Sequence, residues 1–149
     1  MDDPPARATR RQDVRKSSPA TLALQLAIAM GATLPIVASA LDVLHGMPGA
    51  DAWDVNHERY LSGLLFAIGL AFWSTIPNIA EKTARFRLLT FVVVTGGLCR
   101  LLGVLLGDPP TTPVLIALAM ELGVTPALCF WQSRVSSSGE KALRVAFSP

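Results

Sequence analysis

The chain has 149 residues, of which 51% are hydrophobic and only 16% are charged, whereas a typical soluble domain carries about 25% charged residues. This length allows one compact domain and excludes two. All charged residues apart from Arg100 and Glu121 lie outside long uncharged runs. This distribution argues against an ordinary water-soluble fold and leaves an unusually apolar soluble helical bundle as the alternative.

Four of these runs are long enough to cross a bilayer. A helix of about 20 mostly apolar residues spans the roughly 30 Å of hydrocarbon, and a backbone in lipid must satisfy its own N–H and C=O groups. Polar and apolar residues do not alternate in these runs as they do in a strand. We therefore predict an all-α transmembrane domain over residues 18–134, with helices at about 18–41, 59–80, 88–107 and 111–133.

A basic segment, residues 1–17, precedes the first run, and we expect it to be disordered and to orient the chain in the membrane. Asp2, Asp3 and Asp13 dilute its positive charge, so we expect no binding of nucleic acid. Within the first run, Ala38-Ser39-Ala40 resembles a signal-peptidase site. A cleaved signal peptide therefore stays open as the alternative to a retained first helix.

The loop between the first two runs, from Asp42 to Glu58, contains two histidines and several carboxylates. Their spacing matches no known set of metal ligands, so we predict a solvated loop and no metal site. In the second run, Gly63, Ala67 and Ser74 are small residues that we assign to one packing face. We expect another helix to pack there.

The third run places an arginine on one face with three glycines. Gly96, Arg100, Gly103 and Gly107 follow the spacing i, i+4, i+7 and i+11. Glycines allow another backbone to approach closely, so we expect this face, and Arg100 with it, to point into the bundle.

Depth along the helices allows Arg100 to meet Glu121 of the fourth run. Arg100 lies about 10 Å, and Glu121 about 15 Å, from the outer ends of their helices at 1.5 Å per residue. The short connection through Asp108-Pro109-Pro110 makes these helices antiparallel neighbours. Because an unpaired charge in hydrocarbon costs several kcal/mol, we predict an ion pair between the two side chains.

Three predicted helices contain an interior proline, at Pro35, Pro77 and Pro126. Each removes one backbone hydrogen bond and tends to kink the helix. Pro126 follows Glu121 by about one turn, so a widened cavity beside the carboxylate is one interpretation. Ordinary tolerance of proline in membrane helices is the other.

Basic residues are concentrated on one side of the predicted domain. Eleven of the 13 Lys and Arg residues lie in the N-terminal segment, in the loop between the second and third runs, and at Arg134 together with the polar tail of residues 135–149. Short loops rich in Lys and Arg remain in the cytoplasm. We therefore predict an up-down-up-down four-helix bundle with both termini cytoplasmic.

The predicted ion pair has two interpretations. It is a structural pair that sets the register of two helices, or it belongs to a ligand site or proton path, which is the usual hypothesis for ionisable residues inside a membrane. The function we prefer is non-enzymatic. In it, Arg59, Arg100 and Glu121 form a locally positive site for a lipid or other hydrophobic anionic ligand.

Two other functions stay open, so the sequence does not settle whether the chain is an enzyme. One is a cofactor-free membrane isomerase or hydrolase of an apolar substrate, with Glu121 as general acid–base and Arg100 as its electrostatic partner. The other is an oligomeric proton-coupled transporter that assembles through the face of Gly103 and Gly107. The sequence has no phosphate loop, nucleophile elbow, zinc-protease helix or haem motif, so we predict no cofactor.

Three stretches of the chain carry a resemblance to a known family. They are NHERYLSG at 56–63, GGLCRLL at 96–102 followed by Gly107-Asp108-Pro109, and Glu121-Leu122 leading to Trp131-Gln132-Ser133-Arg134. In order and spacing they resemble a family of small bacterial membrane proteins catalogued as domain of unknown function 4345, over roughly Ala23 to Arg134.

The resemblance implies four membrane helices, a retained first helix and no established activity. It makes Arg59, Arg100 and Glu121 positions of the family pattern, without assigning them a role. We therefore expect a multi-pass protein of the bacterial inner membrane. Its expected partners are membrane lipids, a small hydrophobic ligand and a second copy of the chain.

Overall fold

The computed structural model describes residues 19–45, 51–79 and 81–146, with side chains described through residue 137. Across these ranges the chain is helical and contains no strand. The helical stretches long and apolar enough to cross a membrane are Pro19–His45, Ala52–Asn78, Thr83–Leu106 and Thr112–Ser137. The predicted all-α fold with four such helices is confirmed. The predicted N-terminal segment, residues 1–17, lies outside the described residues.

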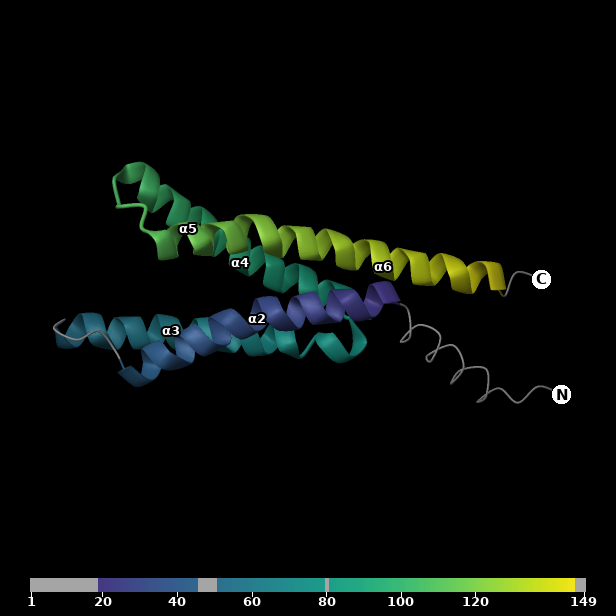
Figure 1. Cartoon of the computed structure of the whole chain (residues 1–149), viewed down its shortest axis with the longest axis horizontal. Coiled ribbons are helices and arrows are strands. Elements are labelled where there is room, and N and C mark those ends of the chain that lie inside the picture. Colours follow the sequence, from purple (N-terminus) through teal and green to yellow (C-terminus); the bar gives the residue numbers. More distant parts are fainter. Residues whose placement is uncertain (1–18, 46–50, 80, 147–149) are drawn as a thin grey trace.

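The first two stretches form a helical hairpin (Figure 1). Helix α2 (Pro19–His45) packs along α3 (Ala52–Trp73). A short 3-10 turn, η1 (Ile76–Asn78), then leads into the second half of the chain. Further contacts, of α2 with α6 and of α3 with α4, join this hairpin to the second one.

The second hairpin pairs α4 (Thr83–Leu106) with a continuous rod of three segments. These segments are α5 (Thr112–Leu118), the π-helical turn η2 (Ala119–Val124) and α6 (Thr125–Ala146). The start of α2 and the end of α6 lie at the same end of the molecule (Figure 1). Successive helices run in opposite directions in Figure 1.

Helix α6 continues beyond residue 133, where we predicted the fourth helix to end. It runs to Ala146, so residues 135–146 of the predicted polar tail are helical. Val135 packs against the core cluster, so the first turn of this extension still belongs to the bundle. The predicted end at residue 133 corresponds to the first charged residue, Arg134. A charged residue marks the edge of the membrane, but a helix can continue beyond that edge into water.

Helix α3 begins at Ala52, well before the predicted start at residue 59. Asp51 caps it, because Oδ1 of Asp51 accepts a hydrogen bond from the backbone N of Asp54 at 2.9 Å and so satisfies a free N–H group of the first turn. The prediction used the charge of Arg59 as the boundary, whereas the capping carboxylate sets it. Arg59 therefore lies on the helix.

The helices of the first hairpin approach each other closely at Gly69. A Cβ atom at this position would lie 2.5 Å from Cγ1 of Ile36 and 3.5 Å from O of Ala32, so glycine permits the contact. The predicted packing face of α3 is wrong, because Gly63 and Ala67 are exposed and no described atom lies within 4 Å of a Cβ placed on Gly63. Small residues occur on two faces of α3, and the position of α2 selects one of them.

The buried core lies where α2, α4 and the α3–α4 connection meet. Leu24, Ile28, Ile79 and Phe86 are each at most 2% exposed. Phe72 packs edge-on against Phe86, with ring centroids 5.3 Å apart, a favourable arrangement for two aromatic rings. This core ties the two hairpins together at the end where α2 begins.

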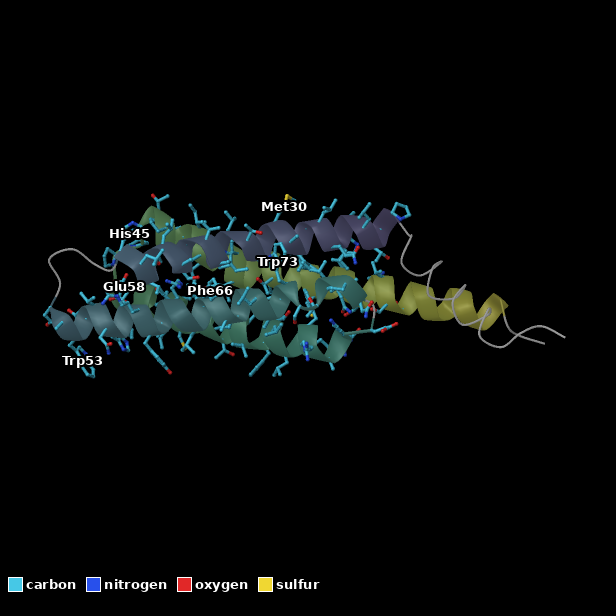
Figure 2. The ribbon with its side chains drawn as sticks, turned by 90° about the horizontal axis from the view of Figure 1, so that it is seen from below. Met30, His45, Trp53, Glu58, Phe66 and Trp73 are labelled. Atoms are coloured by element: carbon cyan, nitrogen blue, oxygen red, sulfur yellow. The ribbon has the colours of Figure 1, made fainter. Side chains whose placement is uncertain are left out.

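The outer surface of the helices is itself apolar. Met30 and Trp53, for example, point away from the bundle (Figure 2) and are 68% and 75% exposed. In water such a continuous apolar surface would require a covering partner, whereas lipid tails solvate it. A small core with apolar side chains outside is what a membrane-spanning bundle requires.

The predicted cleavage motif lies inside α2. Ser39 of this motif is fully buried, and its Oγ donates to O of Pro35 at 2.5 Å. Pro35 lies inside α2, as predicted. The same helix supplies Leu24 and Ile28 to the core. Helix α2 therefore packs as an integral part of the bundle, as a retained first helix must.

The connection between α3 and α4 is a tight turn of partly buried backbone. Helix α3 ends at Trp73, and Pro77 lies in η1. The prediction that Pro77 kinks the interior of a helix is therefore wrong. Proline has no N–H group to continue the helical hydrogen-bond pattern, so the regular helix ends before it.

Two glutamines bind carbonyl groups that this turn leaves free. Nε2 of Gln25 donates to O of Ile76 at 2.7 Å, and Nε2 of Gln132 donates to O of Ile79 at 2.8 Å. Gln132 is fully buried and also donates to Oγ1 of Thr83 at 2.8 Å. Non-helical backbone is tolerated at membrane depth only where protein groups satisfy it, so these glutamines stabilise the reversal of the chain.

Replacing Gln132 with Met is expected to lower the free energy of unfolding by about 2 kcal/mol, because it keeps the side-chain length but leaves O of Ile79 buried without a donor. Gln25→Met should cost less, about 1 kcal/mol, because Gln25 is only half-buried and water reaches its partner more readily. Reversible unfolding in mixed detergent micelles measures both. Equal stability of wild type and Gln132→Met would contradict the role given to Gln132.

Candidate functional site

Arg100 on α4 and Glu121 on η2 form the ion pair that the sequence predicts. Nε of Arg100 donates to Oε2 of Glu121 at 3.1 Å, and Nη2 donates to Oε1 at 3.2 Å. Both carboxylate oxygens are therefore bound by one edge of the guanidinium, a bidentate geometry that adds specificity to the attraction. The two residues lie within the third and fourth membrane-length helices.

Gly97 allows α4 and η2 to approach closely enough for this pair. A Cβ atom at Gly97 would lie 2.8 Å from Cβ of Glu121 and 2.8 Å from Cδ2 of Leu122. At Gly96, by contrast, no described atom lies within 4 Å of the Cβ position. The prediction that Gly96 faces another backbone is wrong: the contact lies about 100° further around the helix, and Arg100 reaches Glu121 from the edge of this contact.

The other two glycines of the predicted face have local roles at the end of α4. Gly107 ends the helix with φ at 119°, a left-handed conformation that glycine adopts without strain. Backbone N of Asp108 then donates to O of Gly103 at 3.0 Å. Assembly of two copies through Gly103 and Gly107 stays a prediction.

Asp108 is a neighbour of the site that the sequence reasoning missed. Its Oδ2 would lie 2.5 Å from a Cβ placed on Gly103, so its carboxylate covers α4 one turn outward from Arg100. The sequence Gly107-Asp108-Pro109 could have predicted this position. A left-handed glycine at the end of a helix directs the next residue back toward the last helical turn.

Glu121 lies on the π-helical turn η2. This turn directly precedes α6, in which Pro126 is the second residue. The ring of Pro126 would clash with the carbonyl of residue 122 in a regular α-helix, and the widened turn relieves this clash. The backbone N–H of Thr125 and its Oγ1 both donate to O of Met120, the hydroxyl at 2.8 Å, so one residue binds this carbonyl of the widened turn twice. Single π-turns are rare and occur frequently at functional sites.

The guanidinium of Arg100 has donors beyond those that bind Glu121. It carries five N–H groups, of which three have no partner among the described residues. The side chain of Arg100 is 42% exposed, whereas that of Glu121 is 18% exposed. The arrangement therefore offers hydrogen-bond donors to a polar group that approaches from outside the bundle.

Arg59 is bound elsewhere. Its Nε donates to O of Val43 at 3.3 Å, near the end of α2, where a cation interacts favourably with the helix dipole. Within the ranges that the structure describes, Arg59 makes no contact with Arg100 or Glu121. The structure thus brings together two of the three predicted ligand-site residues, and a role of Arg59 in that site stays a prediction.

A comparison with models of known protein families finds one match, and it includes the residues of the candidate site. Residues 20–132 match the family described as Domain of unknown function (DUF4345). The chain belongs to the DUF4345 family. The match extends into all four membrane-length helices and includes Arg59, Arg100 and Glu121. No curated protein and no solved structure matches the chain.

The two histidines of this DUF4345 chain make separate contacts. Nδ1 of His45 lies 2.9 Å from O of Leu41, and the ring of His57 stacks on Trp53 with centroids 6.4 Å apart. In residues 19–45, 51–79 and 81–146, no group of three or more His, Cys, Asp and Glu is placed to hold a metal ion.

Proposed function

We propose that this DUF4345 chain is a multi-pass protein of the bacterial inner membrane that binds a lipid or other hydrophobic ligand at Arg100 and Glu121. Four membrane-length helices support the membrane location. The concentration of Lys and Arg beside one end of the bundle supports cytoplasmic termini. The ligand site is supported by the geometry of the pair.

One observation carries the ligand proposal: a guanidinium inside a membrane-length helix is 42% exposed and has three N–H groups without a described partner. Donors left unsatisfied in hydrocarbon cost several kcal/mol. A polar group of a membrane molecule that accepts these hydrogen bonds removes the cost.

The geometry favours binding over the enzyme interpretation. Both oxygens of Glu121 are bound to Arg100, so a general acid–base would have to leave this pair before it transferred a proton. Ligand binding uses the pair as it stands. The transporter interpretation needs assembly through Gly103, and the carboxylate of Asp108 already covers that glycine.

Purified wild-type protein is expected to retain a lipid that the double variant Arg100→Leu/Glu121→Leu retains about tenfold less, because the hydrogen bonds of a charged donor contribute about 1.5 kcal/mol or more. Removing both charges together leaves no unpaired charge. Native mass spectrometry from gentle detergent measures the bound lipid, and circular dichroism verifies the helices.

Arg87→Leu is the matched control, because Arg87 lies on the same helix, is exposed and makes no described hydrogen bond. This variant should retain lipid as the wild type does. Equal retention by the wild type and the double variant would contradict the proposal.

A further inference from the structure

The surroundings of Arg100 hold more negative than positive charge. Glu121 binds it directly, and the carboxylate of Asp108 lies over Gly103, one helical turn outward. Arg59, the second arginine expected here, is bound to the backbone of α2. The described neighbourhood therefore combines one cation with two carboxylates, in place of the locally positive site that the sequence predicts.

This balance disfavours an anionic ligand. A further negative charge in a medium of low dielectric would be repelled by both carboxylates and would find the only nearby described cation already compensated by Glu121. A neutral hydrogen-bond acceptor meets no such repulsion. The free N–H groups on Nη1 and Nη2 form a second edge of the guanidinium, to which a carbonyl oxygen can bind.

The depth of Arg100 matches the glycerol esters of a membrane lipid. Helix α4 has 24 residues, or about 36 Å at 1.5 Å per residue, against about 30 Å of hydrocarbon. Arg100 precedes the last helical residue, Leu106, by about 9 Å, so it lies a few ångströms inside the hydrocarbon boundary. Gly96, one turn deeper on the same face, has open space at its Cβ position, which leaves room for an acyl chain.

We infer that the ligand is a diacyl glycerolipid without net charge, whose ester carbonyl accepts hydrogen bonds from the free edge of Arg100. This ligand class rests on the proposed function of the same site. The two carboxylates exclude anionic lipids, and the ester carbonyl is the group that the site recognises.

A competition among three synthetic lipids tests the inference. Detergent-purified full-length protein is exchanged with equal amounts of diester phosphatidylethanolamine, its diether analogue and diester phosphatidylglycerol, and bound lipids are counted by native mass spectrometry. Only the retention that the Arg100→Leu/Glu121→Leu variant loses is attributed to the site. In that fraction we expect diester phosphatidylethanolamine to exceed each of the other two lipids by about tenfold. The diether analogue loses the charge-assisted hydrogen bonds to the ester carbonyl, and phosphatidylglycerol adds an uncompensated negative charge.

Two further variants test the exclusion of anions. Glu121→Gln removes the charge that compensates Arg100, and Asp108→Asn removes the outer carboxylate without disturbing the pair. Both variants should raise the fraction of phosphatidylglycerol among the bound lipids. Asp108→Asn still tests the exclusion of anions if Glu121→Gln does not fold. Site-dependent retention of phosphatidylglycerol at or above that of phosphatidylethanolamine, or equal retention of diether and diester lipids, would overturn the inference while the proposed function stood. Absence of any site-dependent lipid would overturn both.

Discussion

Glu121→Leu is expected to lower the free energy of unfolding by about 3 kcal/mol. The substitution leaves the guanidinium of Arg100 inside a membrane-length helix without its counter-charge, and breaking a buried pair by removing one partner costs about 3–5 kcal/mol. The lower end of that range applies, because Arg100 is 42% exposed and its long side chain can extend toward the interface. Arg100→Leu should cost at least as much, because the carboxylate that it leaves is only 18% exposed.

The double variant Arg100→Leu/Glu121→Leu should recover to within about 1 kcal/mol of the wild type, because apolar side chains replace the pair with no charge left over. Reversible unfolding of all four proteins in mixed micelles completes a double-mutant cycle, for which these values give a coupling of about 5 kcal/mol. Additive effects of the two single substitutions would show that the pair contributes no coupling, contrary to the bidentate geometry.

Gly97→Val is expected to lower the free energy of unfolding by about 3 kcal/mol. Its Cβ would lie 2.8 Å from Cβ of Glu121 and 2.8 Å from Cδ2 of Leu122, so α4 and η2 must separate. Overpacking alone costs about 1–3 kcal/mol, and separation also weakens the hydrogen bonds between Arg100 and Glu121. Adding Glu121→Leu to Gly97→Val should therefore lower the free energy of unfolding by less than Glu121→Leu does in the wild type.

Gly96→Val is the matched control on the preceding residue. No described atom lies within 4 Å of its Cβ position, and Val has a higher intrinsic helix propensity than Gly. We expect stability within about 0.5 kcal/mol of the wild type in the same unfolding measurement. Equal destabilisation by both valines would show that the close contact of α4 with η2 is not specific to Gly97.

The sequence was sufficient for the number of membrane-length helices and for the ion pair, because both depend on distance along the chain. Each apolar run is long enough to form a membrane-spanning helix, and this length does not depend on which helices pack beside it. Arg100 and Glu121 lie at similar depths on helices joined by a short connection, and a charge in lipid that has one partner in reach pairs with it.

The details of the site depend on angles around the helices, which a residue spacing does not determine. Gly96 and Gly97 are equally small, yet only Gly97 meets η2. The faces of α3 that contain Gly63 and Gly69 are equally plausible for packing, and contact with α2 occurs at Gly69. Arg59 lies near the same predicted membrane interface as Arg100, but its helix packs on α2 and its side chain binds there.

Hydrophobic run length and charge position are properties of the linear chain. They determined the four membrane-length helices of the described residues and the arginine that lies opposite a glutamate. Tertiary structure decided which glycine the helices share, how Gln25 and Gln132 satisfy the turn at η1, and that Asp108 rather than Arg59 is the charged neighbour of the pair. The physical reason is that adjacent residues on a helix point about 100° apart. Only the position of the neighbouring helix determines which of those directions is buried.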